Sequence, residues 1–118
     1  MQLLTEHPYV DNQSVRFDKR TEFVAFIRGD VYFHDGSRLH FRELVDVEVT
    51  LQVVVYSYHY QDADDTLLFR YDNTPHFPTL PNAPHHKHEG SETTVIAATQ
   101  PNLMIVLQEV ETFFMDKE

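Results

Sequence analysis

The chain has 118 residues, no cysteine and a formal net charge of −10, which suits a single domain that buries its own core without disulfides. The missing cysteines exclude a thiol nucleophile and every cysteine-based zinc site. The negative charge argues against unaided, tight and non-specific binding of nucleic acid, but it leaves room for a local cationic pocket that holds one phosphate. The N-terminus lacks the pattern of a signal peptide, and no apolar run is long enough to cross a bilayer, so we expect no membrane partner.

Residues 14–72 predict antiparallel strands, preceded by polar residues 1–13 that we expect to be flexible. Apolar and polar side chains alternate along much of this segment, as they do in half-buried strands. In the first long hairpin, a three-residue turn pairs Val31 with Leu39 and keeps one face of the sheet apolar. Such a turn requires a left-handed conformation at Gly36.

The next two strands, joined by an acidic loop at 62–65, carry the first candidate site residues. Three tyrosines alternate along the first of these strands, and we expect them to face the core. A four-residue loop is expected to pair His59 with Leu68 and Ser57 with Arg70. The face opposite the tyrosines then presents a hydroxyl, a base, a cation and an acid, namely Ser57, His59, Arg70 and Asp72.

Residues 73–92 are predicted to form a long loop rich in proline and histidine. Its four prolines recur every three residues, a spacing that fits a stiff, polyproline-II-like excursion. Five of the eight histidines of the chain lie between residues 56 and 90. Because loops of this length are uncommon in compact domains and usually functional, we expect the functional site here.

The C-terminal part predicts a last short strand at 93–97 and an amphipathic helix at 101–116, in which apolar residues recur at helical spacing. Thr99 is expected to cap this helix, with Pro101 in its first turn. The predicted fold class is α+β, in a single domain spanning 1–118. It comprises an antiparallel sheet of five or six strands, one C-terminal helix packed on its apolar face, and the long Pro/His-rich loop.

The histidines and cations of this region suit metal-independent cleavage of a phosphodiester, with no cofactor. The reaction needs a base for the 2′-hydroxyl proton, an acid for the leaving 5′-oxygen and cations that stabilise the transition state. We expect His59 and one of three neighbouring histidines, His85, His86 or His88, to exchange the protons. Arg70 and Lys87 are the cations expected to hold the phosphate. The candidate catalytic residues are His59, Arg70, Asp72, His76, His85, His86, Lys87 and His88.

Two alternatives stay open. His86 and His88 form an HxH pair, and a third imidazole could complete a site for zinc or another divalent metal in a metal-dependent hydrolase. The third ligand would come from His85, His76 or His59. In the other alternative the domain is a non-enzymatic protein-binding module whose loop is the docking surface for a protein partner. A purely structural interpretation, in which the imidazoles only anchor the loop by hydrogen bonds, also stays open.

Four stretches of the sequence stand out as motifs. They are Asp35-Gly36-Ser37, Tyr56-Ser57-Tyr58-His59-Tyr60-Gln61, Phe69-Arg70-Tyr71-Asp72-Asn73-x-Pro75-His76 and Pro84-His85-His86-Lys87-His88. Together they resemble the TumE-type toxins of prokaryotic toxin–antitoxin modules. The resemblance extends from about residue 15 to the C-terminal helix.

The resemblance implies a cytoplasmic toxin that is neutralised by a cognate antitoxin, usually a helix-turn-helix protein from the same operon. Many toxins of this size act on RNA or translation, so RNA is the expected substrate. An edge strand of the sheet would also make a homodimer easy to form. The residues that match the strings of the family are His59, Arg70, Asp72, Asn73, His76, His85, His86 and His88.

Overall fold

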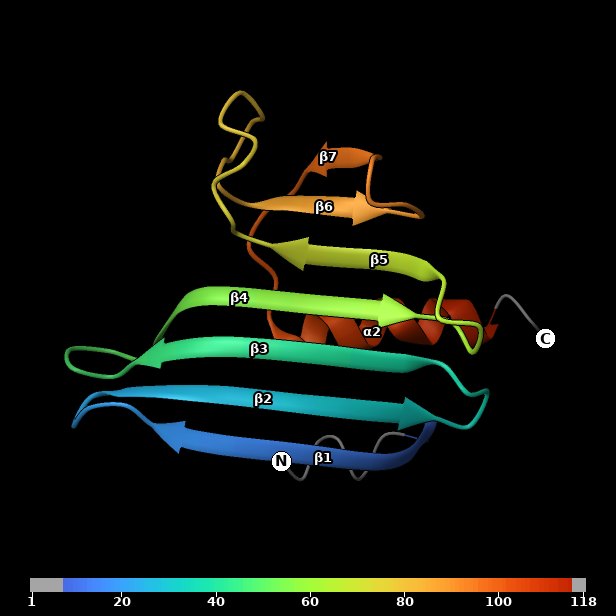
Figure 1. The fold of residues 1–118 in the computed structure, drawn as a ribbon, viewed down its shortest axis with the longest axis horizontal. Helices are drawn as coiled ribbons and strands as arrows, with labels where there is room; N and C mark the ends of the chain where they lie inside the picture. Colours follow the sequence, from blue (N-terminus) through green and yellow to red (C-terminus); the bar gives the residue numbers. More distant parts are fainter. Residues whose placement is uncertain (1–7, 116–118) are drawn as a thin grey trace.

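The computed structural model describes residues 8–115 as one antiparallel sheet and one helix. In this part of the chain the sheet has seven strands, which lie side by side in the order in which they occur in the sequence (Figure 1). The predicted α+β class is confirmed, but the predicted number of five or six strands is wrong. The elements are β1 (Val10–Lys19), β2 (Val24–Phe33), β3 (Arg38–Asp46), β4 (Gln52–Gln61), β5 (Leu67–Asp72), β6 (His86–Glu89), β7 (Val95–Ala97) and α2 (Leu103–Met115).

Strand β6 is the strand that the sequence pattern does not predict. It lies inside the segment 73–92, for which the proline spacing predicts a loop, and it pairs antiparallel with β5. Its four residues, His-Lys-His-Glu, include no aliphatic or aromatic hydrophobe. Hydrophobic alternation therefore cannot reveal it, and only its pairing with β5 and β7 defines it as a strand.

The remaining connection, residues 73–85, folds through turns and is not the extended excursion that the proline spacing predicts. Two successive turns, at 77–80 and 80–83, are each closed by a hydrogen bond from the amide of the last residue to the carbonyl of the first. Pro78 and Pro81 occupy the second position of these turns. Proline fixes φ near −65°, which suits that turn position as well as a polyproline-II segment, so the spacing does not separate the two.

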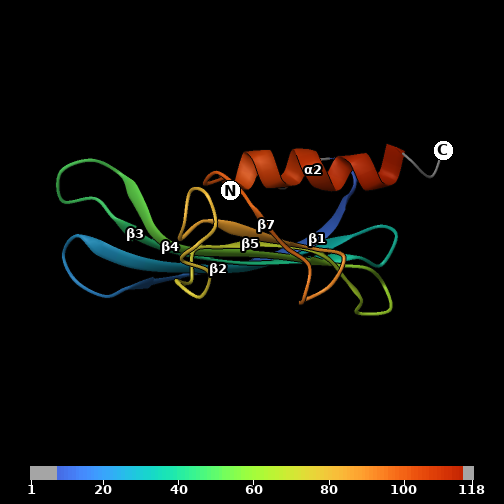
Figure 2. The same ribbon diagram turned by 90° about the horizontal axis from the view of Figure 1, so that it is seen from above.

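Helix α2 covers one face of the sheet and leaves the other face open (Figure 2). Between helix and sheet lies a core that is rich in aromatic rings, including Phe41, Tyr58 and Tyr60, each with 0% of its surface exposed. Gly29 of β2 makes room for this core, because a Cβ atom there would lie 2.5 Å from the ring of Phe41. The helix residues buried in the core are Val106, Leu107, Val110 and Phe114.

The helix begins two residues later than predicted, and its cap is a different residue. The side chain of Asn102 accepts a hydrogen bond from the amide of Ile105 at 2.9 Å, so Asn102 and not Thr99 is the N-cap. Pro101 precedes the helix and is buried. Within residues 8–115 no helix is both long and apolar enough to span a membrane.

The first long hairpin agrees with its prediction. Val31 pairs with Leu39, and Gly36 has a φ of 87° in the turn between β2 and β3. Strand β1 starts at Val10, earlier than residue 14, where the predicted strands begin, so only part of the segment predicted to be flexible precedes the sheet. Residues 1–7 of that segment lie outside the described residues.

The register of the β4–β5 hairpin differs by two residues from the prediction. His59 pairs with Arg70 and Ser57 with Asp72, because the amide of Asp62 bonds to the carbonyl of Thr66 and a bulge follows at Gln61. A shift of two residues changes the pairs but keeps every side chain on its face. The four polar residues of this hairpin therefore still share the face opposite the tyrosines.

Candidate active site

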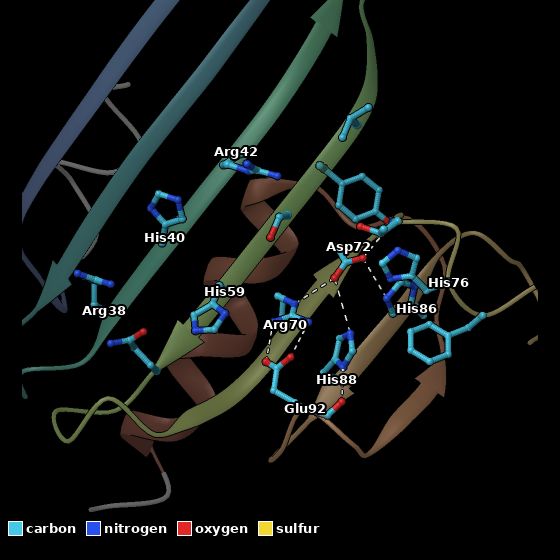
Figure 3. Close-up of a pocket in the computed structure, with 16 residues that line it drawn as sticks. Arg38, His40, Arg42, His59, Arg70, Asp72, His76, His86, His88 and Glu92 are labelled. Atoms are coloured by element: carbon cyan, nitrogen blue, oxygen red, sulfur yellow. Dashed lines mark hydrogen bonds and ion pairs between the residues drawn. The ribbon is translucent and has the colours of Figure 1, made fainter.

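The open face of the sheet carries a cavity of about 720 Å³. Strands β3 to β6 contribute side chains to it, and the 73–85 connection forms one of its walls (Figure 3). Because strand side chains alternate between faces, most of the strand residues that line it have neighbours that face the helix. The lining residues are Arg38, His40, Arg42, Val55, Tyr56, Ser57, His59, Gln61, Arg70, Asp72, Thr74, His76, Phe77, His86, His88 and Glu92.

Six of the eight predicted catalytic residues line this cavity, whereas Lys87 and His85 do not. Lys87 extends toward the helix, where its Nζ atom lies 2.6 Å from Glu109 Oε2 and above the rings of Phe69 and Tyr71. Lys87 lies between two histidines of β6 that face the cavity, so the alternation of side chains places Lys87 on the other face of the sheet. The six residues brought together are His59, Arg70, Asp72, His76, His86 and His88.

His85 and Asn73 support the cavity from outside its lining. His85 stacks on Tyr56, and its Nδ1 atom lies 2.8 Å from the Tyr56 hydroxyl oxygen. Asn73 ties the end of β5 to β4, since its side chain accepts from the amide of Tyr56 at 3.1 Å and donates to the carbonyl of Val54 at 2.9 Å. Asn73 therefore holds the start of the 73–85 connection against β4, and His85 holds its end.

His59 occupies the middle of the cavity floor, between His40 on β3 and Arg70 on β5 (Figure 3). Burial lowers the pKa of His59 below its ordinary value, and the positive charge of Arg70 lowers it further. Glu92 and Gln61 oppose this shift without cancelling it. The His59 ring is therefore neutral near pH 7 and available to accept a proton.

Strand β3 supplies three cavity residues to which the sequence analysis assigns no function: Arg38, His40 and Arg42. His40 is the cross-strand partner of His59, and its Nδ1 atom lies 3.0 Å from Asp30 Oδ1. Arg38 Nε lies 3.7 Å from the same carboxylate oxygen. The alternation of β3 places all three on its polar face, but only the pairing of β3 with β4 brings them beside His59.

Arg70 is held by two carboxylates. It donates from both terminal nitrogens to Glu92, at 2.6 and 2.9 Å, and from Nε to Asp72 at 3.0 Å. Burial acts to lower the pKa of Arg70, but the bonds to Glu92 and Asp72 outweigh it and raise the pKa. Glu92 lies in the turn between β6 and β7 with 58% of its side chain exposed, so this contact can open toward solvent.

Asp72, His86 and His88 form a buried cluster at the other end of the cavity (Figure 3). His86 Nε2 lies 3.0 Å from Asp72 Oδ1, and His88 Nε2 lies 3.7 Å from Asp72 Oδ2. Burial acts to raise the pKa of Asp72, but hydrogen bonds from Thr74 and Arg70 lower it below its ordinary value. This carboxylate, and not His85 or His76, is the third potential ligand beside the predicted HxH pair.

The charge of the cavity is opposite to that of the chain. Three of the nine lysines and arginines of the protein, Arg38, Arg42 and Arg70, line it, together with His40 and His59. Acidic lining residues are confined to the Asp72 and Glu92 side of Arg70. A protein with a net charge of −10 thus lines this cavity with three arginines and two carboxylates, a small local excess of positive charge.

Comparison with known proteins identifies one family. A family model described as Toxin TumE matches residues 1–114, which confirms the resemblance drawn from the sequence motifs. Neither the curated proteins nor the solved structures include a match.

Proposed function

The chain belongs to the TumE toxin family, and from this premise we propose that it is a toxin that cleaves RNA without a metal ion. Membership of the family implies a toxin–antitoxin partner. The observation that carries the proposal is the position of His59. Its lowered pKa leaves a neutral base at the centre of a cationic cavity, between a second histidine and an arginine.

In the proposed reaction His59 takes the proton from a ribose 2′-hydroxyl. The 2′-oxygen then attacks the adjacent phosphorus, the bond to the 5′-oxygen breaks, and this oxygen receives a proton from an acid. The products are a 2′,3′-cyclic phosphate and a free 5′-hydroxyl. General acid and base groups of this kind each accelerate a reaction by about 10²–10⁴-fold.

We propose His40 as the acid. It lies directly across the β3–β4 ladder from His59, where opposing Cβ atoms are about 4.5–5.5 Å apart. Asp30 orients its ring through the 3.0 Å contact with Nδ1 and can balance the charge of a protonated imidazole. This assignment replaces the proton-transfer role predicted for one of His85, His86 or His88, because His85 lies outside the lining and the other two are tied to Asp72.

The phosphate is proposed to bind between Arg38, Arg42 and Arg70, which stabilise the additional negative charge of the transition state. Lys87, ion-paired with Glu109 on the opposite face, has no part in this proposal. Glu92 holds Arg70 through two parallel hydrogen bonds, the geometry with which arginine also binds a phosphate. An incoming phosphate would therefore displace the exposed Glu92 carboxylate.

We propose that the antitoxin is a helix-turn-helix protein from the same operon and that the toxin acts in the cytoplasm. Strand β1 forms one edge of the sheet, and edge-to-edge pairing of two such strands would give a homodimer. Analytical ultracentrifugation of the toxin alone and with the protein encoded next to it separates these assemblies.

The test compares the parent chain with His59→Gln and with His34→Gln, a matched change at an exposed histidine outside the cavity lining. Each protein is expressed alone in bacteria while growth and total RNA are followed. The purified proteins are then incubated with end-labelled RNA in the presence of a chelator. We expect growth arrest and fragments with 2′,3′-cyclic phosphate ends from the parent and from His34→Gln, and about 100-fold slower cleavage from His59→Gln.

A substrate with a 2′-deoxyribose at the cleaved position should resist the parent enzyme. Intact RNA together with growth arrest would instead favour the alternative that the domain is a non-enzymatic module that binds another protein. Cleavage by His59→Gln at the parental rate would remove His59 as the base.

A further inference from the structure

We propose that Asp72, His86 and His88 bind one divalent transition metal ion, with Zn²⁺ as the ion best suited to the ligands. The three residues are buried, with 6%, 1% and 5% of their surfaces exposed. Their ligand atoms all lie within 4.8 Å of one another. This inference goes beyond the proposed RNA cleavage, in which none of the three residues takes part.

The backbone fixes the protonation of both rings. His86 Nδ1 lies 2.9 Å from the carbonyl oxygen of Pro84, and His88 Nδ1 lies 3.0 Å from that of Glu92. A carbonyl oxygen only accepts hydrogen bonds, so each Nδ1 atom carries a hydrogen. In a neutral ring the lone pair is then on Nε2, the nitrogen that binds a metal. Metal-binding histidines are commonly oriented by this kind of bond from the other nitrogen.

Both Nε2 atoms face one carboxylate. They lie 3.0 and 3.7 Å from the two oxygens of Asp72, which like a lone pair on nitrogen only accept. The amide of Thr74 and Nε of Arg70 already donate to these oxygens from other directions. The convergence of three accepting groups is stable only with a cation between them, either a proton or a metal ion.

The spacing suits a metal ion. Ligand atoms at about 2.0–2.2 Å from Zn²⁺ in a tetrahedron are about 3.4 Å apart. One oxygen of Asp72 lies 3.0 Å from His86 Nε2 and the other lies 3.7 Å from His88 Nε2, and the ligand atoms of the three residues all lie within 4.8 Å of one another. Two imidazoles and one carboxylate favour Zn²⁺ and other first-row transition metals over Mg²⁺ and Ca²⁺, which prefer oxygen ligands. Three protein ligands leave a fourth position for water.

The ion would connect the two ends of the 73–85 connection. Asp72 ends β5, His86 begins β6, and the ring of Phe77 from the connection packs on His86 and His88 with centroids 4.8 and 5.9 Å away. Metal binding would therefore fix the wall of the cavity against β5 and β6. Its role is structural, apart from the proton transfers assigned to His40 and His59.

The test measures binding of Zn²⁺ itself to the full chain, purified without a histidine tag and stripped with a chelator. A chromophoric competitor gives stoichiometry and affinity, and thermal unfolding gives stability. We expect one ion per chain, and at about 100 times the Kd an unfolding midpoint raised by about 10 °C. The visible spectrum of the Co²⁺-loaded protein should report nitrogen and oxygen ligands in a four-coordinate site.

Asp72→Asn is the decisive variant, because it keeps the size of the side chain and one accepting oxygen but removes the charge and the carboxylate ligand. We expect it to bind Zn²⁺ at least about 100-fold more weakly while it unfolds cooperatively, and His88→Gln to behave in the same way. The controls His76→Gln and His85→Gln change histidines outside the cluster and should bind as the parent does.

Absence of stoichiometric binding by the parent would overturn the proposal and leave a proton shared between His86 and Asp72. Unchanged affinity in Asp72→Asn, or lost affinity in both controls, would overturn the choice of ligands. The two proposals fail separately. A parent chain that binds one Zn²⁺ ion but cleaves no RNA, with or without the ion, would remove the proposed reaction only, and RNA cleavage by a parent chain that binds no Zn²⁺ would remove the metal site only.

Discussion

The two faces of the sheet are made by the same strands and differ in almost every property. Along β4, Tyr58 and Tyr60 are fully buried beneath helix α2, whereas His59 between them faces an open cavity. Polar atoms of the covered face bond to one another, as the Tyr58 hydroxyl does to Glu43 at 2.5 Å. On the open face the polar groups are the lining of the cavity. One face therefore supplies stability, and the other is free to carry chemistry.

Lys87 and its neighbours show how sharply the faces are separated. Its Nζ atom and the Tyr71 hydroxyl both bond to Glu109 of the helix, each at 2.6 Å. Burial and the bond to Glu109 raise the pKa of Tyr71 to about 12, so this group stays protonated. His86 and His88, the residues on either side of Lys87, belong to the cavity. Five predictions test whether stability and activity divide between the faces in this way.

The largest effect is expected in the core. Phe41→Ala removes a fully buried ring of β3, which lies over Gly29 of β2 in the core. The substitution should lower the free energy of unfolding by about 3–5 kcal/mol. Chemical denaturation monitored by circular dichroism measures this loss. A cost below about 1 kcal/mol would contradict the assignment of stability to the covered face.

Arg42→Ala should give the converse result. Arg42 lines the cavity, and its removal is expected to slow RNA cleavage by about 100-fold while the free energy of unfolding changes by less than about 0.5 kcal/mol. The matched control is Arg28→Ala, since Arg28 pairs with Arg42 across β2 and β3 and stacks on the same Phe26 ring but lies outside the cavity lining. Equal losses of activity in the two variants would contradict a specific role of Arg42 in the cavity.

Lys87→Met tests a cation that lies within one of the sequence motifs shared with the family but faces the helix. It keeps the apolar stem over Phe69 and Tyr71 and removes the ion pair with Glu109. We expect a loss of about 1–2 kcal/mol in the free energy of unfolding and parental RNA cleavage. A large loss of cleavage in a stable variant would restore Lys87 to the catalytic residues.

The smallest effect concerns pH. His59 lies against Arg70 of β5, His40 of β3, Glu92 of the β6–β7 turn and Gln61 of its own strand, and its pKa is lowered from 6.5, first by burial. The neutral base should therefore persist below pH 6.5, and on the acid side of the profile kcat/KM should fall by about 10-fold per unit as the pH drops below the lowered pKa. A decline on acidification that already begins above pH 6.5 would contradict this assignment.

The same shift has a consequence for stability with a definite sign. Between pH 6.5 and the lowered pKa, the unfolded chain binds a proton at His59 that the folded chain does not. Stability is therefore lost as the pH falls through this window. The pH dependence of unfolding should be weaker in His59→Gln than in the parent, and an identical dependence would show that the ring is not buried as described.

The sequence by itself determines the features of the fold that depend on residues close to one another along the chain. Period-two alternation assigns Tyr58 to the core and His59 to the open face, and this assignment survives a register error of two residues. The turn at Gly36 and the apolar stripe of α2 follow from equally local signals. The motifs also identify the family.

The tertiary structure decides which strands meet. The four polar residues of β6 become a strand only by pairing with β5, and this pairing sets His86 and His88 against Asp72. Likewise, only the pairing of β3 with β4 sets His40 and the β3 arginines beside His59. Hydrogen bonds between strands join residues that are distant in the sequence, and a polar strand such as β6 shows no hydrophobic alternation that would reveal it. Neither site could therefore be assembled from the sequence alone.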